Sequence, residues 1–164
     1  MTLRSRGVAL GAAVGSLSLV AGCSGDPEIA SYGLDDADQA ACEAFVADLP
    51  AVLADEDEVE VDGDGDPVLG AAYGDPAITV TCGVPTPDGF DQTSSCEVAD
   101  GVGWYVAPEA FDDQDADVVL TAAGYRPAVA VEVPGELRPD APAAAIAELA
   151  ALVEQHLTLE QRCS

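Results

Sequence analysis

Apolar residues recur with helical spacing in one segment near each end of the chain. The first segment, residues 36–49, has apolar positions at i, i+3, i+4 and i+7, which are Cys42, Phe45, Val46 and Leu49. Asp35 or Asp36 is suited to cap its start, and Pro50 ends it. The second segment, residues 142–159, has Asp140 near its cap and an apolar stripe of Ile146, Leu149, Val153 and Leu157. Each segment is predicted to be a helix with one face towards a core.

Alternating apolar and polar residues predict strands between these two helices. In residues 77–84, Thr79 and Thr81 alternate with apolar residues of the opposite face, which are Ile78, Val80, Cys82 and Val84. Residues 96–99 and 102–106 flank Asp100-Gly101, a dipeptide suited to a tight hairpin turn. Residues 118–122 and 127–133 are predicted to form a second hairpin around Gly124-Tyr125, and residues 59–61 a short strand.

The order of these elements is helix, several strands with short connections, and helix. This order predicts an α+β fold with a mainly antiparallel sheet of about five strands. The N-terminal and C-terminal helices are expected to pack on one face of that sheet. Residues 36–164 are predicted to form a single domain.

The first 23 residues have the pattern of a lipoprotein signal peptide. Arg4 and Arg6 precede an uncharged run over residues 7–21, and Val20-Ala21-Gly22 leads directly to Cys23. We expect cleavage after residue 22 and lipidation of the Cys23 thiol, with at least two acyl chains for stable anchoring. Residues 23–35 are then a lipidated tether, in which Ile29 and Tyr32 offer a brief edge strand. This places the protein on the extracytoplasmic face of the cell membrane.

Two alternatives to lipidation of the N-terminus are an uncleaved membrane anchor and ordinary secretion. An uncleaved membrane anchor needs roughly 20 apolar residues, but the run over residues 7–21 has only 15. Ordinary secretion would leave Cys23 as a free or paired thiol.

The other four cysteines predict a disulfide-stapled domain, because an exported protein folds under oxidising conditions. Four cysteines allow three pairings, and the sequence alone does not choose between them. We favour Cys42 with Cys163, since the helix cysteine points inward where the chain end can meet it, and Cys82 with Cys96 as hairpin-like neighbours. A zinc site has little support, because no CxxC motif occurs and His156 is the only histidine.

The charge of the chain restricts its partners. Residues 23–164 contain all 31 acidic residues and only Arg126, Arg138 and Arg162 as basic ones, so their formal charge is 3 minus 31, or −28. This excludes nucleic acid as a partner, because its phosphates need basic residues. It also excludes direct adhesion of the domain to anionic head groups. A lipid anchor to the membrane and an envelope protein partner remain compatible with the charge.

The most acidic run, residues 55–66, resembles a calcium loop only at its start. An EF-hand loop counted from Asp62 would need Gly at its sixth position and Glu at its twelfth, but these are Pro67 and Tyr73. We therefore expect a solvated loop and no metal site, with a weak cation site over residues 62–66 as the alternative.

No set of residues forms a recognisable catalytic site, and no cofactor is expected. His156 is the only residue that could act as a histidine base, and its place on the final helix favours a structural role. Trp104 should share the inner face of its strand with Val102 and Val106, although Trp104 and Tyr105 would also suit a sugar-stacking platform. Three classes stay open: an interaction module of the envelope, a module binding a small ligand or cation, and a hydrolase of wall polymers.

Several of these segments together resemble one known family. They are Cys42 with Leu49-Pro50, residues 74–84 from Gly-Asp-Pro to Cys-Gly-Val, Cys96 with Gly101-Val102-Gly103-Trp104, residues 127–134, and Arg162-Cys163. The chain is similar over nearly its whole mature length to the family called domain of unknown function 3515. The resemblance implies an actinobacterial membrane-attached or secreted protein and brings no established activity. Two positions depart from the family pattern: Tyr73 replaces a usual Trp, and Tyr125 separates Gly124 from Arg126.

Overall fold

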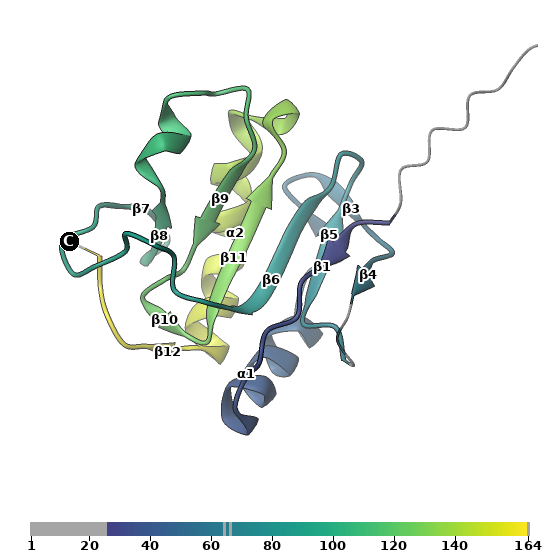
Figure 1. Ribbon diagram of the computed structural model, residues 1–164. Coiled ribbons are helices and arrows are strands. Elements are labelled where there is room, and N and C mark those ends of the chain that lie inside the picture. The colour runs from purple at the N-terminus through teal and green to yellow at the C-terminus, as the bar shows by residue number, and fades with distance from the viewer. Residues whose placement is uncertain (1–25, 64, 66, 164) are drawn as a thin grey trace, which may run out of the picture.

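Eight strands form one antiparallel sheet in the computed structural model, which describes residues 26–63, 65 and 67–163 (Figure 1). Their order across the sheet is β2-β3-β5-β6-β11-β9-β8-β7. The strands are β2 (Val52–Leu53), β3 (Glu56–Val59), β5 (Gly70–Tyr73), β6 (Ile78–Val84), β7 (Cys96–Ala99), β8 (Val102–Val106), β9 (Val118–Thr121) and β11 (Ala128–Val133). Both predicted hairpins are present, as β7 with β8 and β9 with β11.

Two shorter strand pairs flank the main sheet. At one side, β1 (Glu28–Ile29) pairs in parallel with β4 (Asp62–Gly63). At the other side, β10 (Tyr125–Arg126) pairs with β12 (Thr158–Leu159) in antiparallel fashion. In Figure 1, β1 and the C-terminus therefore lie at opposite ends of the molecule.

The two predicted helices are confirmed as α1 (Asp36–Ala47) and α2 (Asp140–His156). The Asp35 carboxylate caps α1, accepting hydrogen bonds from the backbone N–H groups of Ala37 and Asp38 at 3.0 and 2.9 Å. Helix α2 ends before residue 159, because Leu157 turns to an extended conformation and the next two residues form β12. Two short 3₁₀ helices are η1 (Pro108–Phe111) and η2 (Gly135–Leu137).

Both long helices pack on the same face of the sheet, which we call the helix face; α2 is seen behind β9 and β11 in Figure 1. The largest side chains between the helices and the sheet are completely buried, among them Phe45, Trp104 and Leu149. The α+β class predicted from the sequence is therefore correct. The sheet is larger than the predicted five strands, because β2, β3 and β5 extend it.

Strand β5 was not predicted from the sequence. All four of its residues are buried, and three of them are Gly70, Ala71 and Ala72. Glycine and alanine have low strand propensity, so the alternating pattern that marks other strands is absent here. A Cβ added to Gly70 would come within 2.2 Å of the Val80 carbonyl oxygen and 2.8 Å of Ile29 Cγ2. Gly70 therefore has no room for a side chain, because the backbone of β6 and the side chain of Ile29 lie directly against it.

The folded domain begins earlier than residue 36. Ile29 is only 1% exposed and packs over Gly70 on the sheet face opposite the helices. Glu28 and Ile29 are also hydrogen-bonded in β1. Within the predicted tether, Glu28 and Ile29 are thus already part of the folded domain. Cys23 and the predicted signal peptide lie outside the described residues.

All four remaining cysteines form disulfides, but the favoured pairing was wrong. Cys42 is bonded to Cys82, and Cys96 to Cys163, with Cα–Cα distances of 5.5 and 5.8 Å. The prediction treated neighbours in sequence as neighbours in the sheet. In the structure β11, β9 and β8 separate β6 from β7, so Cys82 is far from Cys96 and instead lies beneath α1. The C-terminal tail returns to the β7 edge, where Cys163 meets Cys96.

Within the described ranges, no helix combines the length and apolar character needed to cross a membrane.

Candidate functional site

The face of the sheet opposite the helices carries an open groove, which we call the sheet groove. Its floor comes from alternate residues of β6, β11 and β9, namely Thr79, Thr81, Ala130, Glu132, Val119 and Thr121. One wall is the segment 28–32, and the other is the segment 84–87. The groove has a volume of about 330 Å³.

The groove exists because the sheet face opposite the helices is covered at both sides and left open between them. At one side Ile29 of β1 covers β5. At the other side the ring of Phe90 packs edge-on against Tyr105 of β8, with ring centroids 5.4 Å apart. The strands between them have small or polar residues on this face, and in the described part of the chain no other element covers them.

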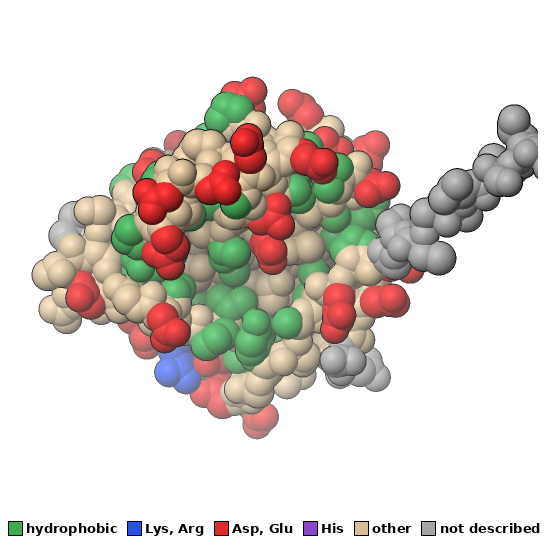
Figure 2. All heavy atoms as spheres, turned by 45° about the horizontal axis from the view of Figure 1, so that its top comes forward, with side chains coloured by type: hydrophobic (Ala, Val, Ile, Leu, Met, Phe, Trp, Pro, Cys, Tyr) green, Lys and Arg blue, Asp and Glu red, His purple; other side chains and the backbone are tan. Residues whose placement is uncertain are grey.

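The groove combines exposed apolar surface with negative charge. Tyr32 and Val119 line it and are 40% and 46% exposed. Glu28 and Glu132 also line it, and no lysine, arginine or histidine is among its described lining residues. Figure 2 shows hydrophobic side chains in the hollow and acidic side chains clustered around its upper rim. The surface therefore suits a partner that is apolar in part and positively charged.

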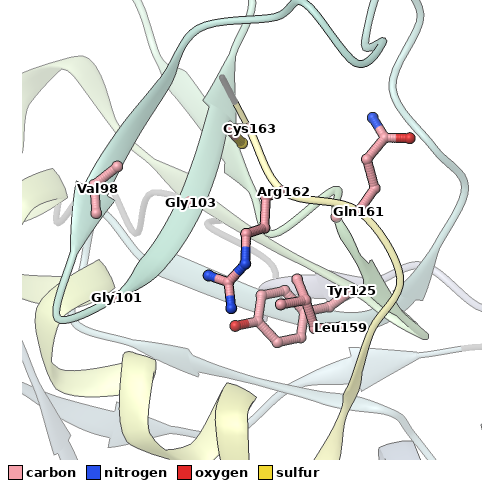
Figure 3. A pocket seen from close by; sticks show the side chains of 9 residues that line it. Val98, Gly101, Gly103, Tyr125, Leu159, Gln161, Arg162 and Cys163 are labelled. Carbon is pink, nitrogen blue, oxygen red and sulfur yellow. The ribbon is translucent and has the colours of Figure 1, made fainter.

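A second hollow, the C-terminal pocket, lies where β10 and β12 meet the β7–β8 hairpin (Figure 3). It has a volume of about 170 Å³. Its lining residues are Val98, Gly101, Gly103, Gly124, Tyr125, Leu159, Gln161, Arg162 and Cys163. In Figure 3 the guanidinium group of Arg162 points towards the ring and hydroxyl group of Tyr125.

The electrostatics of this pocket centre on Tyr125. Burial raises the pKa of the Tyr125 hydroxyl, and the negative charge of Glu154 raises it further, while the positive charge of Arg162 acts in the opposite direction. Glu154 also approaches the turn at Gly101, where an added Cβ would lie 3.5 Å from its Oε1 atom. A cation and a neutral phenol thus line this small pocket, and the carboxylate of Glu154 lies near it.

His156, the only histidine, has a structural environment. Its Nε2 atom lies 2.8 Å from Oδ2 of Asp48, and the Gln155 amide donates to the same oxygen at 3.2 Å. These contacts join the end of α2 to the end of α1, and no hydroxyl or thiol group takes part in them. The position fits the structural role favoured from the sequence.

The two adjacent aromatic residues of β8 do not form a sugar-stacking platform. Trp104 is completely buried with Val102 and Val106 on the helix face, as the alternation predicted. Its Nε1 atom has no hydrogen-bond partner among the described residues. Tyr105 lies on the opposite face but is only 7% exposed, since Phe90 covers it.

The described part of the acidic run brings no group of metal ligands together. Asp62 and Gly63 belong to β4, while Asp64 and Asp66 lie outside the described residues. Among the residues that the structure describes, no group of three or more His, Cys, Asp or Glu side chains is placed to hold a metal ion.

Sequence reasoning missed both hollows. Thr79 and Thr81 marked a polar strand face, but whether that face is covered depends on β1 and on the segment 84–94, which are distant in sequence or irregular. Arg162 was noted only as part of the family resemblance at Arg162-Cys163, and only the fold places it beside Tyr125 and the β7–β8 turn.

Comparison with known proteins places the chain in a family without supplying a function. No curated protein matches it, and no solved structure does. A family model described as "Protein of unknown function (DUF3515)" matches residues 7–162, which is nearly the entire chain. The chain therefore belongs to the DUF3515 family.

Proposed function

We propose that this protein is a lipid-anchored envelope protein at the outer face of the plasma membrane and acts there as an interaction module. In this proposal Cys23 carries the lipid, and the sheet groove receives an extended, positively charged segment of a partner protein. The observation that carries the proposal is the groove itself. It is an uncovered strip of sheet with exposed apolar side chains and acidic lining residues.

The sequence before the domain supports the anchor. Arg4, Arg6, the uncharged run and the small residues before Cys23 have the order that lipid attachment requires. Glu28, the first residue of β1, follows Cys23 by five positions. A chain of that length reaches at most about 18 Å. An acylated Cys23 would thus keep the β1 side of the domain close to the bilayer surface.

The form and charge of the groove support a protein partner. The strands of its floor are already paired on both sides, so a partner would be recognised through side chains rather than by adding a strand. Glu28 and Glu132 offer two carboxylates, and the formal charge of −28 on residues 23–164 attracts a basic segment over longer distances. A basic segment with apolar residues would complement both features.

A wall-polymer hydrolase has less support. The only histidine is held by Asp48 and Gln155 between two helix ends. The alternative of a module that binds a small ligand has its own specific observation in the C-terminal pocket.

Replacement of the anchor cysteine tests the first half of the proposal. Cys23→Ser is expected to move the protein from the membrane fraction to the soluble exported fraction, while the parent chain needs detergent for release. Mass spectrometry of the mature N-terminus should find a diacylated Cys23. An unmodified thiol at Cys23 in the mature protein would refute the anchor.

Site-specific photocross-linking in intact cells tests the groove. A photoreactive residue at Val119, on the groove floor, should give one discrete protein adduct. The matched control is Val52 of β2, which is equally exposed at 45% but lies outside the groove. Glu132→Lys should abolish the Val119 adduct, because it reverses a charge on the floor. Adducts of equal yield from both positions, or an adduct that persists with Glu132→Lys, would refute the groove as the binding surface.

A further inference from the structure

We propose that the C-terminal pocket binds a small molecule through its carboxylate group, which is held by the guanidinium of Arg162 and the hydroxyl of Tyr125. This site lies at the opposite end of the sheet from β1, so the inference is independent of the lipid anchor and of the sheet groove (Figures 1 and 3).

Arg162 differs from the other two arginines of the domain, which are held by hydrogen bonds or ion pairs to other residues of the chain. Arg126 forms ion pairs with Asp35 and Asp38 at 3.0 and 3.1 Å. Arg138 donates to the carbonyl oxygens of Asp113 and Ala116 at 3.1 and 2.9 Å. Arg162 makes no hydrogen bond or ion pair with any other residue of the described ranges. The Arg162 guanidinium is therefore available to an external anion, in a chain with 31 acidic residues.

The backbone holds Arg162 in place from both sides. On one side, the Gln161 N–H donates to the Gly124 carbonyl oxygen at 3.0 Å. On the other side, Cys163 is bonded to Cys96 of β7. Gly103 lets this disulfide lie directly on β8, since a Cβ there would be 2.7 Å from the Cys163 Sγ atom. The pocket is thus preorganised, which lowers the entropy cost of binding.

The chemistry of the lining favours a carboxylate. A guanidinium group presents parallel N–H donors that match the two oxygens of a carboxylate. The Tyr125 hydroxyl remains protonated at neutral pH and is a further donor. The volume of about 170 Å³ is close to that of a cavity that holds one benzene ring, so only a small molecule fits.

Glu154 narrows the class of ligand. Its negative charge acts on Tyr125, and it forms no ion pair with Arg162 within 4 Å. A doubly charged phosphate would be repelled by this carboxylate more than a singly charged carboxylate group would. A ligand with an ammonium group beside its carboxylate would interact favourably with both Arg162 and Glu154. An amino acid with a small side chain has this arrangement.

The test is a titration of the processed full-length protein, labelled with ¹⁵N, in which NMR follows the Nε–H group of Arg162. L-Alanine, sodium acetate and inorganic phosphate are compared at constant ionic strength. We expect a saturable shift with L-alanine, a weaker one with acetate and none with phosphate. Shifts that do not saturate, or that sodium chloride alone reproduces, would refute the site.

Variants separate binding at this pocket from general effects of charge. Arg162→Gln should weaken L-alanine binding roughly tenfold or more, because it removes a charge-assisted pair of hydrogen bonds. Tyr125→Phe should weaken it about fivefold through loss of one hydrogen bond. The matched control is Arg126→Gln, which removes the same charge from an arginine outside the pocket and should leave binding unchanged. Equal affinity in Arg162→Gln and the parent chain would overturn the proposal.

Discussion

The two faces of strand β6 show how differently neighbouring residues are used in this fold. On the helix face, Ile78, Val80 and Cys82 are between 0 and 2% exposed. On the groove face, Thr79 and Thr81 are only partly buried and form part of the groove floor. Both sets belong to one regular strand with the same neighbours, β5 and β11. The difference therefore comes from what packs above each face and not from the strand.

This contrast separates stability from recognition. The helix face buries Phe45, Trp104 and Leu149 completely, so changes there should cost folding energy. The groove face has side chains that reach solvent, so most changes there should leave folding intact and, if the proposed function is correct, alter binding instead. Substitutions matched in size on the two faces can test this separation.

The largest effects are expected from the two disulfides, of which the first crosses the helix face. The double variant Cys42→Ala/Cys82→Ala removes a cross-link between residues 40 positions apart. The chain-entropy model gives a loss of about 4 kcal/mol in the free energy of unfolding. Denaturation with guanidinium chloride measures this loss, and hydrogen exchange should show α1 opening first.

The second disulfide serves as the comparison. Cys96→Ala/Cys163→Ala opens a loop of 67 residues and should cost a similar amount, about 4 kcal/mol in the same model. Its local effect should instead be confined to the C-terminal tail and the C-terminal pocket. If both variants loosened the same segment, the assignment of the first disulfide to the helix face would be wrong.

A smaller effect on the free energy of unfolding is expected from exchanging valine and threonine, which have similar shapes, on the two faces of β6. Val80→Thr places a hydroxyl group in a completely buried site, and an unsatisfied buried polar group costs about 1 to 3 kcal/mol. Thr81→Val makes the reverse change on the groove face and should stay within about 0.5 kcal/mol of the parent chain. Thermal and chemical denaturation of both variants provide the measurement. Equal destabilisation by the two changes would remove the distinction between the faces.

The sequence predicted only some of the residues and elements that form the two faces of the sheet. The 3.6-residue periodicity fixed the two helices, and the alternation in residues 77–84 correctly assigned Val80 to the core and Thr81 to the other side. Strand β5 was missed because Gly70, Ala71 and Ala72 are small for packing reasons that only the folded chain reveals. Periodicity tells which residues share a face, but it does not tell which elements cover that face.

The sequence also did not reveal which distant segments of the chain lie side by side in the sheet. The pairing of β6 with β11 brings together segments separated by four intervening strands and a 3₁₀ helix, and no local signal specifies it. The disulfide prediction failed for this reason. The same limit hid the C-terminal pocket, whose Tyr125 and Arg162 are distant in sequence.

A single hydrogen bond on the helix face should give an effect of about 1 kcal/mol. The Tyr73 hydroxyl donates to the Pro50 carbonyl oxygen at 2.9 Å, and Tyr73→Phe removes this bond without changing the ring. Burial raises the pKa of Tyr73 to about 12, compared with 10 for an exposed tyrosine.

The sign of the pH effect follows from these two pKa values. Because the folded state holds the proton more tightly, the contribution of Tyr73 is complete below pH 10 and is lost as the pH rises towards 12. The stability of the parent chain should therefore fall across this window more steeply than that of Tyr73→Phe. Urea denaturation at pH 8 and pH 11 measures both chains. Parallel pH profiles for the two chains would show that Tyr73 is accessible to water.

The smallest effect should arise outside both faces, where Arg126 of β10 contacts the start of α1. The pKa of Asp35 is lowered first by the hydrogen bond from the Asp38 N–H, then by that from the Ala37 N–H, and only after these by Arg126. Arg126→Gln should therefore raise the pKa of Asp35 only part of the way to its ordinary value of 3.8. The contribution of Asp35 to stability is present above that value and is lost as the pH falls through the lowered pKa, so the variant should lose it at slightly higher pH.

NMR titration of the carboxyl carbons measures the shift in the pKa of Asp35. Asp91, whose pKa is lowered by Thr93 and Ser94, is the internal control that should not change. A complete return of Asp35 to its ordinary pKa would mean that the ion pair, and not the helix cap, governs this carboxylate.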